Sequence, residues 1–397
     1  MIESAKQPAT TFDRRSISVL SFAHMLNDVN QGAIPALLPF LVTERNLSYT
    51  AASGIILTAT VISAILQPLL GLYSDRHPIP WLIPLGTLLG GLGIALSGLT
   101  ANYWLIIAAM LVSGAGVAAF HPEGYRFANY VSRERRATGM SIFSTGGTLG
   151  FALGPLMMTT AVLTFGLEGS LVLLVPAAIY ALVLWFELPR LSQFREHHHA
   201  SRAESEASPT NWSAFLRLTV VIVLRSVLYY GLLAFLPLYL IKLREVSIPE
   251  ANGALTILAI SGAIGALVLG NIADRIGQKR VLLISLMAMT PAILLLLNVE
   301  KNFIPVLVVV VGITVISVST VTVVMGQEYA AGNLGVASGI TTGFAIGLGG
   351  LGSPILGHVA DVYGLNWVML ILAALPVAGL ALALTLPRKT TEKIETP

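Results

Sequence analysis

The stretch GNIADRIGQKR, residues 270–280, is a short charged turn between two long apolar runs. Its opening glycine and its Asp-Arg pair recur after a shift of 199 residues at residues 71–76, where the sequence reads GLYSDR. The same shift places the glycine and proline of residues 150–155 on those of residues 349–354. One offset that is kept at two distant places predicts a chain made of two related halves.

The composition excludes a soluble globular protein. Hydrophobic residues make up 55% of the 397 residues, charged residues only 11%, and the mean hydropathy is +0.80. A soluble domain covers its surface with about 25% charged residues, so the apolar surface of this chain must face lipid. Long apolar runs without alternation favour helices over a membrane β-barrel. The expected fold class is an all-α integral membrane protein.

Twelve apolar stretches are long enough to cross a bilayer, which takes about 20 residues of helix. Together with the repeat, they predict two pseudo-symmetric six-helix halves, residues 16–190 and 213–387. A cytoplasmic segment (1–15) precedes the halves, a cytoplasmic linker (191–212) joins them and a cytoplasmic tail (388–397) follows. The predicted spans are Ser16–Leu41, Ala51–Tyr73, Trp81–Leu99, Tyr103–Tyr130, Thr138–Phe165, Leu171–Phe186, Ala214–Ile241, Ala251–Ala273, Val281–Val299, Phe303–Tyr329, Val336–Ala360 and Trp367–Leu386.

The distribution of Lys and Arg predicts the orientation, because cytoplasmic loops retain these residues. With a cytoplasmic N-terminus, eighteen of the 23 basic residues fall on the cytoplasmic side and four on the other side. Both termini are therefore expected in the cytoplasm. The net charge of +3 then reflects topology and gives no support to a nucleic-acid partner. The chain has no cysteine, which excludes disulfides and thiol chemistry.

Several of these motifs resemble those of a known family. Residues 270–280 resemble the loop signature of the major facilitator superfamily, and the glycines and proline of residues 146–155 resemble a motif of its proton-coupled exporters. Within that superfamily the chain resembles the fosmidomycin resistance proteins, which are bacterial efflux carriers, at residues 24–28, 67–69, 75–81, 120–123, 141–143 and 326–328. The resemblance implies a monomer in the bacterial inner membrane that expels a small molecule such as a phosphonate antibiotic. It also implies the proton gradient as driving force, with no bound cofactor.

The first span carries the densest polar group. His24, Asn27, Asp28 and Gln31 are spaced i, i+3, i+4 and i+7, which predicts a single helical face. An ionised side chain at mid-membrane costs roughly 2.5–3.5 kcal/mol, so this face should line a cavity. We expect Asp28 and His24 to couple protons, and Asn27 and Gln31 to contact substrate. The alternative is that His24 and Asp28 only pair with each other to stabilise helix packing.

The apolar run of the fourth span is interrupted at His121-Pro122-Glu123, where proline bends the helix and removes a backbone donor. His121 and Glu123 are predicted to form a second group that exchanges protons. The alternative is a helix end at which these residues pair with Arg126.

The second half of the chain supplies the other predicted substrate contacts. Arg225 lies inside the apolar seventh span, with Tyr229 one turn further on, and a guanidinium binds phosphonate or carboxylate through two parallel hydrogen bonds. A counter-ion for Asp28 and a purely structural role are the alternatives for Arg225. Gln327 and Glu328 near the inner end of the tenth span are also predicted substrate contacts, and helix capping is the alternative for Glu328.

The remaining motif residues are predicted to control conformational change and to bind nothing. Glycines at four-residue spacing let helices approach closely, and an acidic group near a helix N-terminus can latch one conformation through the helix dipole. The predicted gating residues are Asp75, Arg76, Asp274, Arg275, Gly150, Gly154 and Pro155.

The predicted function is therefore a secondary active transporter, proton-coupled and exporting, that works by alternating access. The rival is a proton symporter that imports a small organic anion. A membrane receptor or membrane-embedded enzyme is remote, because no nucleophile–base set and no metal-ligand cluster occurs at plausible spacing. The tract His197-His198-His199 in the linker is interpreted as a solvated loop, with metal binding as the alternative.

Overall fold

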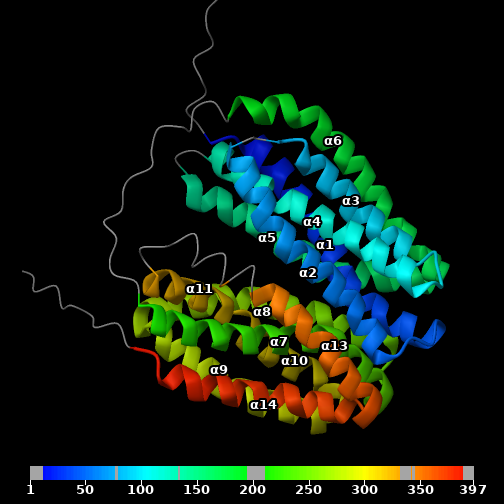
Figure 1. Cartoon of the computed structure of the whole chain (residues 1–397), viewed down its shortest axis with the longest axis vertical. Coiled ribbons are helices and arrows are strands. Elements are labelled where there is room, and N and C mark those ends of the chain that lie inside the picture. Colours follow the sequence, from blue (N-terminus) through cyan, green and yellow to red (C-terminus); the bar gives the residue numbers. More distant parts are fainter. Residues whose placement is uncertain are drawn as a thin grey trace, which may run out of the picture. The chain divides into compact units, whose positions relative to one another are not determined.

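The computed structural model describes residues 12–76, 79–132, 135–194, 211–330, 341 and 345–387, and almost all of these residues are helical (Figure 1). The first part of the chain forms α1 (Arg14–Glu44), α2 (Tyr49–Arg76), α3 (Leu82–Ser97), α4 (Tyr103–Ser132), α5 (Arg136–Phe165), the 3-10 helix η2 (Leu167–Leu173) and α6 (Leu174–Gln193). The second part forms α7 (Trp212–Arg244), α8 (Ile248–Ile276), α9 (Gln278–Asn298), η3 (Lys301–Phe303), α10 (Ile304–Ile316), α11 (Val318–Tyr329), α13 (Ala345–Tyr363) and α14 (Leu365–Leu384).

The prediction of an all-α membrane protein is confirmed. Among the described residues, nine helical stretches have the length and hydropathy of a membrane span, and α10 with α11 counts as one of them. When α10 and α11 are taken together, the described helices correspond one to one with the twelve predicted spans. The break between α10 and α11 at Ser317 was not predicted.

The described residues group into two compact units. The first holds the described residues up to Ala33 and those between Leu66 and the linker; the second holds Ile34–Ile65 and the described residues after the linker. The later part of α1 and the earlier part of α2 thus group with the second unit. Within that unit the Nδ2 of Asn252 in α8 donates to the carbonyl of Ala36 at 3.0 Å. The sequence boundaries 16–190 and 213–387 describe the repeat, and as domain limits they stay a prediction.

In the first unit, α5 packs closely against α1 through a row of glycines. A Cβ on Gly154 would lie 2.5 Å from the Val29 carbonyl oxygen, and a Cβ on Gly150 would meet the backbone of Met25. Pro155 has no N–H, so the carbonyl of Phe151 lacks its usual helical donor. That carbonyl faces Gly32 of α1, at a place where any side chain would collide with it.

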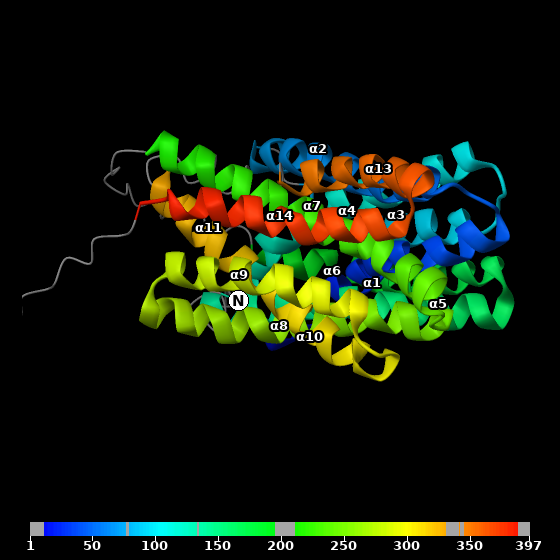
Figure 2. The same ribbon diagram turned by 90° about the horizontal axis from the view of Figure 1, so that it is seen from below.

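In the second unit, α7, α13 and α14 lie side by side (Figures 1 and 2). Asp361 near the end of α13 accepts hydrogen bonds from the backbone N–H groups of Tyr49 and Thr50 at 2.8 and 2.9 Å, and from the Thr50 hydroxyl at 2.6 Å. A carboxylate at this position satisfies N–H groups that the first turn of α2 leaves without a helical partner.

Candidate functional site

The strongest site in the first unit is built around the Asp28 carboxylate. His24 Nε2 lies 3.3 Å from Asp28 Oδ2, and His121 Nε2 lies 3.3 Å from Asp28 Oδ1. Gln31 Nε2 donates to Oδ1 at 2.8 Å. We call His24, Asp28, Gln31 and His121 the carboxylate–imidazole group. It joins α1 to α4. Its two histidines, His24 in α1 and His121 in α4, are 97 positions apart in the sequence.

The backbone fixes the protonation site of both rings. His24 Nδ1 lies 2.9 Å from the carbonyl oxygen of Phe143 in α5, and His121 Nδ1 lies 2.9 Å from the carbonyl oxygen of Val117. A carbonyl oxygen can only accept, so each Nδ1 carries a hydrogen and donates it. Each Nε2 is thereby left to face the carboxylate.

The number of exchangeable protons bound by the carboxylate–imidazole group determines its charge and its hydrogen bonds. With both Nδ1 positions protonated, each Nε2···Oδ contact forms a hydrogen bond only if one proton lies between its two atoms. Without such a proton the group has a charge of −1 and lone pairs face each other at both contacts. One proton makes the group neutral, and a second gives it a charge of +1 with both contacts satisfied. The group therefore has distinct places for up to two exchangeable protons.

Aromatic side chains enclose the His24 ring, which is 3% exposed. The Phe143 ring stacks on it with a centroid separation of 4.2 Å, and Tyr125 approaches it edge-on at 5.7 Å. The Asp28 and His121 side chains are 14% and 13% exposed, so they are less enclosed than the His24 ring.

Gly147 of α5 makes room for this group and was missed by the sequence analysis. A Cβ at this position would lie 2.5 Å from His24 Nε2 and 2.7 Å from Asp28 Oδ2. Its neighbour Gly146 belongs to the glycine motif and packs against Ser21. The double glycine in the sequence was the available signal, because one glycine of the pair falls outside the four-residue spacing.

Asn27 lies at the edge of the predicted face, on the side where α3 packs. Its side chain is fully buried, and its Oδ1 lies 3.1 Å from where a Cβ on Gly90 of α3 would be. Around the helix Asn27 is about 100° from Asp28, but only about 40° from Gln31 and about 60° from His24, so its position marks one edge of this face. His24, Asp28 and Gln31 are on one face as predicted, and a substrate contact for Asn27 stays a prediction.

Glu123 lies in a separate cluster. Its Oε1 accepts a hydrogen bond from Arg126 Nη1 at 2.6 Å, and the same nitrogen donates to the carbonyl and the hydroxyl of Ser74 in α2 at 2.9 and 2.8 Å. Glu123 is fully buried, as a carboxylate can be when a guanidinium accompanies it. His121 thus joins Asp28, whereas Glu123 joins Arg126, which matches the alternative considered for Glu123.

Arg225 in α7 is a partly buried cation whose hydrogen-bond partners among the described residues are neutral. Its Nη1 donates to the Val315 carbonyl at 3.2 Å and its Nη2 reaches the Ser226 hydroxyl at 3.5 Å, while its buried Nε has no hydrogen-bond partner in the described part of the chain. Val315 is the second-last residue of α10, so the break at Ser317 helps free the carbonyl that receives the guanidinium. Tyr229 and Tyr230 lie close to Arg225 in the same helix.

The other predicted site residues lie as follows. Asp274 and Arg275 are exposed in the last turn of α8. Gln327 and Glu328 are half-buried in the last turn of α11. Asp75 and Arg76 end α2, but their side chains are outside the described part of the structure, as is the tract 197–199. Gly150, Gly154 and Pro155 are in the contact of α5 with α1.

Spacing along the chain gave no metal-ligand cluster, but the fold brings three groups of the ligand type together. The ligand atoms of His24, Asp28 and His121 lie within 4.8 Å of one another. Both Nε2 atoms already contact the carboxylate directly, which suits a shared proton. The absence of a metal and of a cofactor therefore stays a prediction.

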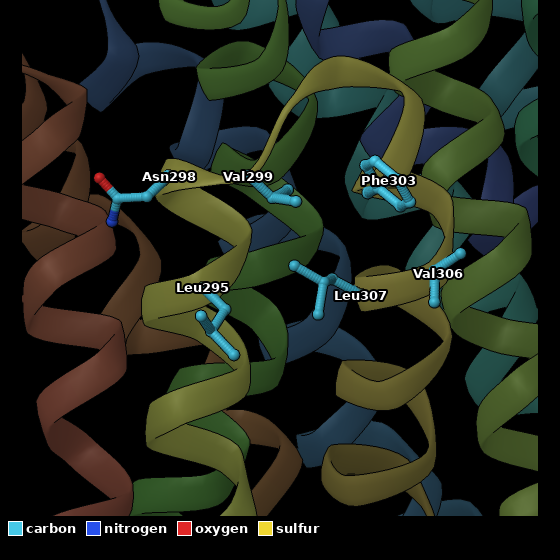
Figure 3. Close-up of a pocket in the computed structure, with 6 residues that line it drawn as sticks. All are labelled: Leu295, Asn298, Val299, Phe303, Val306 and Leu307. Carbon is cyan, nitrogen blue, oxygen red and sulfur yellow. The ribbon is translucent and has the colours of Figure 1, made fainter.

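A pocket in the second unit has a mostly apolar lining, unlike the carboxylate–imidazole group. It has a volume of about 370 Å³ and lies between α9 and α10, lined by Leu295, Asn298, Val299, Phe303, Val306 and Leu307 (Figure 3). No lining side chain can exchange a proton, and Leu295, Phe303 and Val306 are exposed as lipid-facing residues are. Its chemistry does not support ion coupling.

Comparison with known proteins places the chain in a family. The profile of the Major Facilitator Superfamily matches residues 20–350 and 244–397. The chain is 31% identical to the fosmidomycin resistance protein of Escherichia coli (strain K12), over 94% of this chain and 93% of that protein. It is also 31% identical to the uncharacterized MFS-type transporter YfnC of Bacillus subtilis (strain 168), over 97% and 95%.

Solved structures agree with this fold. A mutant of the nucleoside transporter NupG has a TM-score of 0.74 at 15% identity, covering 93% of this chain and 99% of that chain. A bacterial homologue of the lysosomal transporter Spinster also has a TM-score of 0.74 at 15% identity, covering 94% and 96%. With a family profile that spans the chain and relatives aligned over nearly their whole length, this protein belongs to the major facilitator superfamily of membrane transporters.

Proposed function

We propose that this protein is a proton-coupled efflux transporter of the bacterial cytoplasmic membrane, with both termini in the cytoplasm. The observation that carries the proposal is the Asp28 carboxylate held between two Nε2 atoms whose rings are both oriented by backbone carbonyls. A largely buried group with places for two protons suits a carrier that exchanges protons for a solute.

Charge explains how protons and substrate compete. Loading the carboxylate–imidazole group with protons changes its charge from −1 toward +1. In a medium of low dielectric constant, such a change alters the free energy of a nearby charged or polar solute much more than it would in water. Alternating access then needs the loaded and unloaded groups to favour different conformations. A proton that moves inward across 100 mV supplies about 2.3 kcal/mol.

Arg225 is proposed as a substrate contact in the second unit. A partly buried guanidinium that has no carboxylate partner among the described residues is costly, and an anionic group on a substrate would offset that cost. The fork geometry of the guanidinium accepts phosphonate and carboxylate alike. Replacement by lysine keeps the charge but loses the fork, so Arg225→Lys should raise KM for an anionic drug and Arg225→Gln should raise it further.

The direction of transport is proposed from the relatives. The Escherichia coli relative is named for resistance to fosmidomycin, and export is the simplest way for a transporter to confer resistance. The second candidate is a proton symporter that imports an organic anion, which the Arg225 Nε, left without a partner among the described residues, also suits.

Everted membrane vesicles separate the two candidates. In vesicles energised to an acidic interior, adding fosmidomycin should discharge the pH gradient if the protein is an antiporter. A wider drug panel, with a phosphonate included, should be run in parallel. Vesicles with Asp28→Asn serve as control and should show no discharge. If no compound discharges the gradient in wild-type vesicles, the antiport proposal fails.

A further inference from the structure

The carboxylate–imidazole group has the composition of a transition-metal site as well as that of a proton site. It presents two imidazole nitrogens and one carboxylate, a ligand set that proteins use for zinc with water in the fourth position. The three ligand atoms lie within 4.8 Å of one another, and among the described residues this is the one cluster of three such side chains. The chain has no cysteine that would supply a competing thiolate site.

The separations between the ligand atoms fit a tetrahedral ion. Two ligands of a tetrahedral zinc ion, each about 2.0 Å from the metal, are about 3.3 Å apart. His24 Nε2 lies 3.3 Å from Asp28 Oδ2, and His121 Nε2 lies 3.3 Å from Asp28 Oδ1. No separation among the three ligand atoms exceeds 4.8 Å, so closing on an ion takes a shift of at most about 1.5 Å. We expect Asp28 and His121 to make this shift, because they are less enclosed than His24.

The backbone orients both imidazoles as a metal site requires. A metal-bound histidine usually donates its second ring N–H to a carbonyl or carboxylate, which fixes the ring and raises its basicity. His24 Nδ1 donates to the Phe143 carbonyl and His121 Nδ1 to the Val117 carbonyl, each at 2.9 Å. Both Nε2 lone pairs are thereby available to an ion. The fourth position is left to water or to the amide oxygen of Gln31, whose Nε2 already contacts the carboxylate at 2.8 Å.

We propose that the carboxylate–imidazole group binds Zn²⁺ in place of its exchangeable protons, and that the bound ion acts as an inhibitor of transport and not as a resident cofactor. Imidazole ligands favour zinc and its neighbours in the transition series, whereas Mg²⁺ and Ca²⁺ prefer oxygen ligands. With one carboxylate and two neutral imidazoles, the dication gives the group a charge of +1. The group has the same charge when it holds two protons, and one Zn²⁺ that replaces both of them releases two protons.

The equal charge explains why zinc should stop the transport cycle. The zinc-bound group resembles the fully protonated group electrostatically, so it favours the same conformation. It cannot pass protons on, because its nitrogen and oxygen lone pairs are bound to the metal. The cycle therefore halts in the loaded state.

Zinc and protons should compete within the group itself. From α4 the two rings are also met by Tyr125, while Glu123 of the same helix is paired with Arg126. From α5 they are met by Phe143 and Gly147, neither of which titrates. Metal ligands must be deprotonated to bind, so zinc affinity should fall as the pH falls and protons refill the group.

The first test measures metal binding and does not depend on transport. The tract His197-His198-His199 offers imidazole ligands of its own, so the full chain is produced without a histidine tag and with these three residues replaced by alanine. We call this protein the tract variant. It should bind one Zn²⁺ per chain, and Co²⁺ in its place should give the intense visible absorption of a tetrahedral site. No binding, or the weak absorption of octahedral Co²⁺, would overturn the proposal.

Substitutions in the tract variant then locate the ion. His121→Gln and Asp28→Asn each remove a ligand and should weaken Zn²⁺ binding at least about tenfold, whereas His358→Gln, at an exposed histidine of α13, should leave it unchanged. Equal affinities in all three would overturn the site.

A thiolate ligand gives a second measurement that does not rely on loss of binding. His121→Cys introduces the only cysteine of the chain and keeps a ligand for zinc at this position. Bound Co²⁺ should then show a sulfur-to-metal charge-transfer band. Bound Co²⁺ without this band would place the ion elsewhere and overturn the proposal.

The inhibition rests on the proposed function and is measured in proteoliposomes of the tract variant with an imposed pH gradient. Zn²⁺ should suppress drug transport, chelation with EDTA should restore it, and suppression should weaken at lower pH. His121→Gln should need at least about tenfold more Zn²⁺ for half-inhibition. Transport that is unaffected by bound Zn²⁺ would overturn the inhibition. If no compound is transported without zinc, the proposed function fails, and the binding tests still decide whether the metal site exists.

Discussion

At the scale of single residues, the chemistry is concentrated where three backbone segments meet around Asp28. α1 supplies the Asp28 carboxylate and the His24 ring, and α4 supplies the His121 ring. α5 supplies the Phe143 carbonyl and, at Gly147, a position where the lack of a side chain leaves room for the group. None of the three helices holds the site by itself.

Removing the charge at Asp28 should uncouple transport from protons. Asp28→Asn keeps the size of the side chain but cannot exchange a proton, so we expect normal expression with drug transport near background. His121→Gln should weaken coupling less, because His24 remains. Transport driven by an imposed pH gradient is the measurement, and His358→Gln, an exposed histidine in α13, is the matched control. Unchanged transport by Asp28→Asn would remove this carboxylate from the mechanism.

Gly147→Ala should disturb the same group without removing any of its members. The added methyl would lie 2.5 Å from His24 Nε2, so the ring or the carboxylate must move. Such overpacking typically costs about 1–3 kcal/mol. We expect a lowered unfolding temperature and impaired proton coupling. The control is Gly253→Ala in α8, where a Cβ would meet nothing within 4 Å, and equal behaviour of the two variants would contradict the prediction.

At the scale of elements, the start of α1 is tied to the end of α6. Asp13 caps α1 through Ser16, and Arg190 Nη2 donates to Asp13 Oδ2 at 2.9 Å. Burial by itself would raise the pKa of Asp13, but the hydrogen bonds from Arg190 and Ser16 outweigh it and lower the pKa below its ordinary value of 3.8. The ionised form therefore stabilises the folded chain.

The sign of this pKa shift sets the pH window. Because the folded pKa is the lower one, the stabilisation is fully present above pH 3.8 and is lost as the pH falls through the folded pKa. At pH 6, Asp13→Asn should have a lower free energy of unfolding than wild type, by at most about 1 kcal/mol because Arg190 is partly exposed. It should therefore unfold at a lower temperature. The difference should shrink below pH 4. Thermal unfolding in detergent at several pH values measures it, and a difference independent of pH would rule out the carboxylate as its cause.

At the scale of the whole molecule, orientation is the property that most needs a test. We expect Ser4→Cys to be protected from an impermeant thiol reagent in intact cells and Ala101→Cys, between α3 and α4, to be labelled. Disrupting the membrane should expose both, which controls for thiol reactivity. Labelling of Ser4→Cys in intact cells would reverse the proposed topology.

Hydropathy was sufficient to predict the all-α class and the number of helices, because a helix that crosses lipid needs about 20 apolar residues. The 199-residue repeat added the division into two related halves. The pairing of His121 with Asp28 was not predictable, since spacing along one helix says nothing about a partner in another. The break at Ser317 has no glycine or proline to signal it. The i, i+3, i+4 spacing defines a broad face, and the sequence could not show that α3 packs on the side of that face where Asn27 lies.

The hydrogen bond between His24 and the Phe143 carbonyl has a mechanical consequence. A proton that arrives at Nε2 turns the ring into an imidazolium, and the opposite N–H then becomes a charge-assisted donor, roughly twice as strong. Protonation of His24 in α1 would therefore strengthen its hydrogen bond to the Phe143 carbonyl in the backbone of α5. Isotope-edited infrared spectroscopy should detect it, as a lower stretching frequency of a single labelled carbonyl when the transporter is loaded.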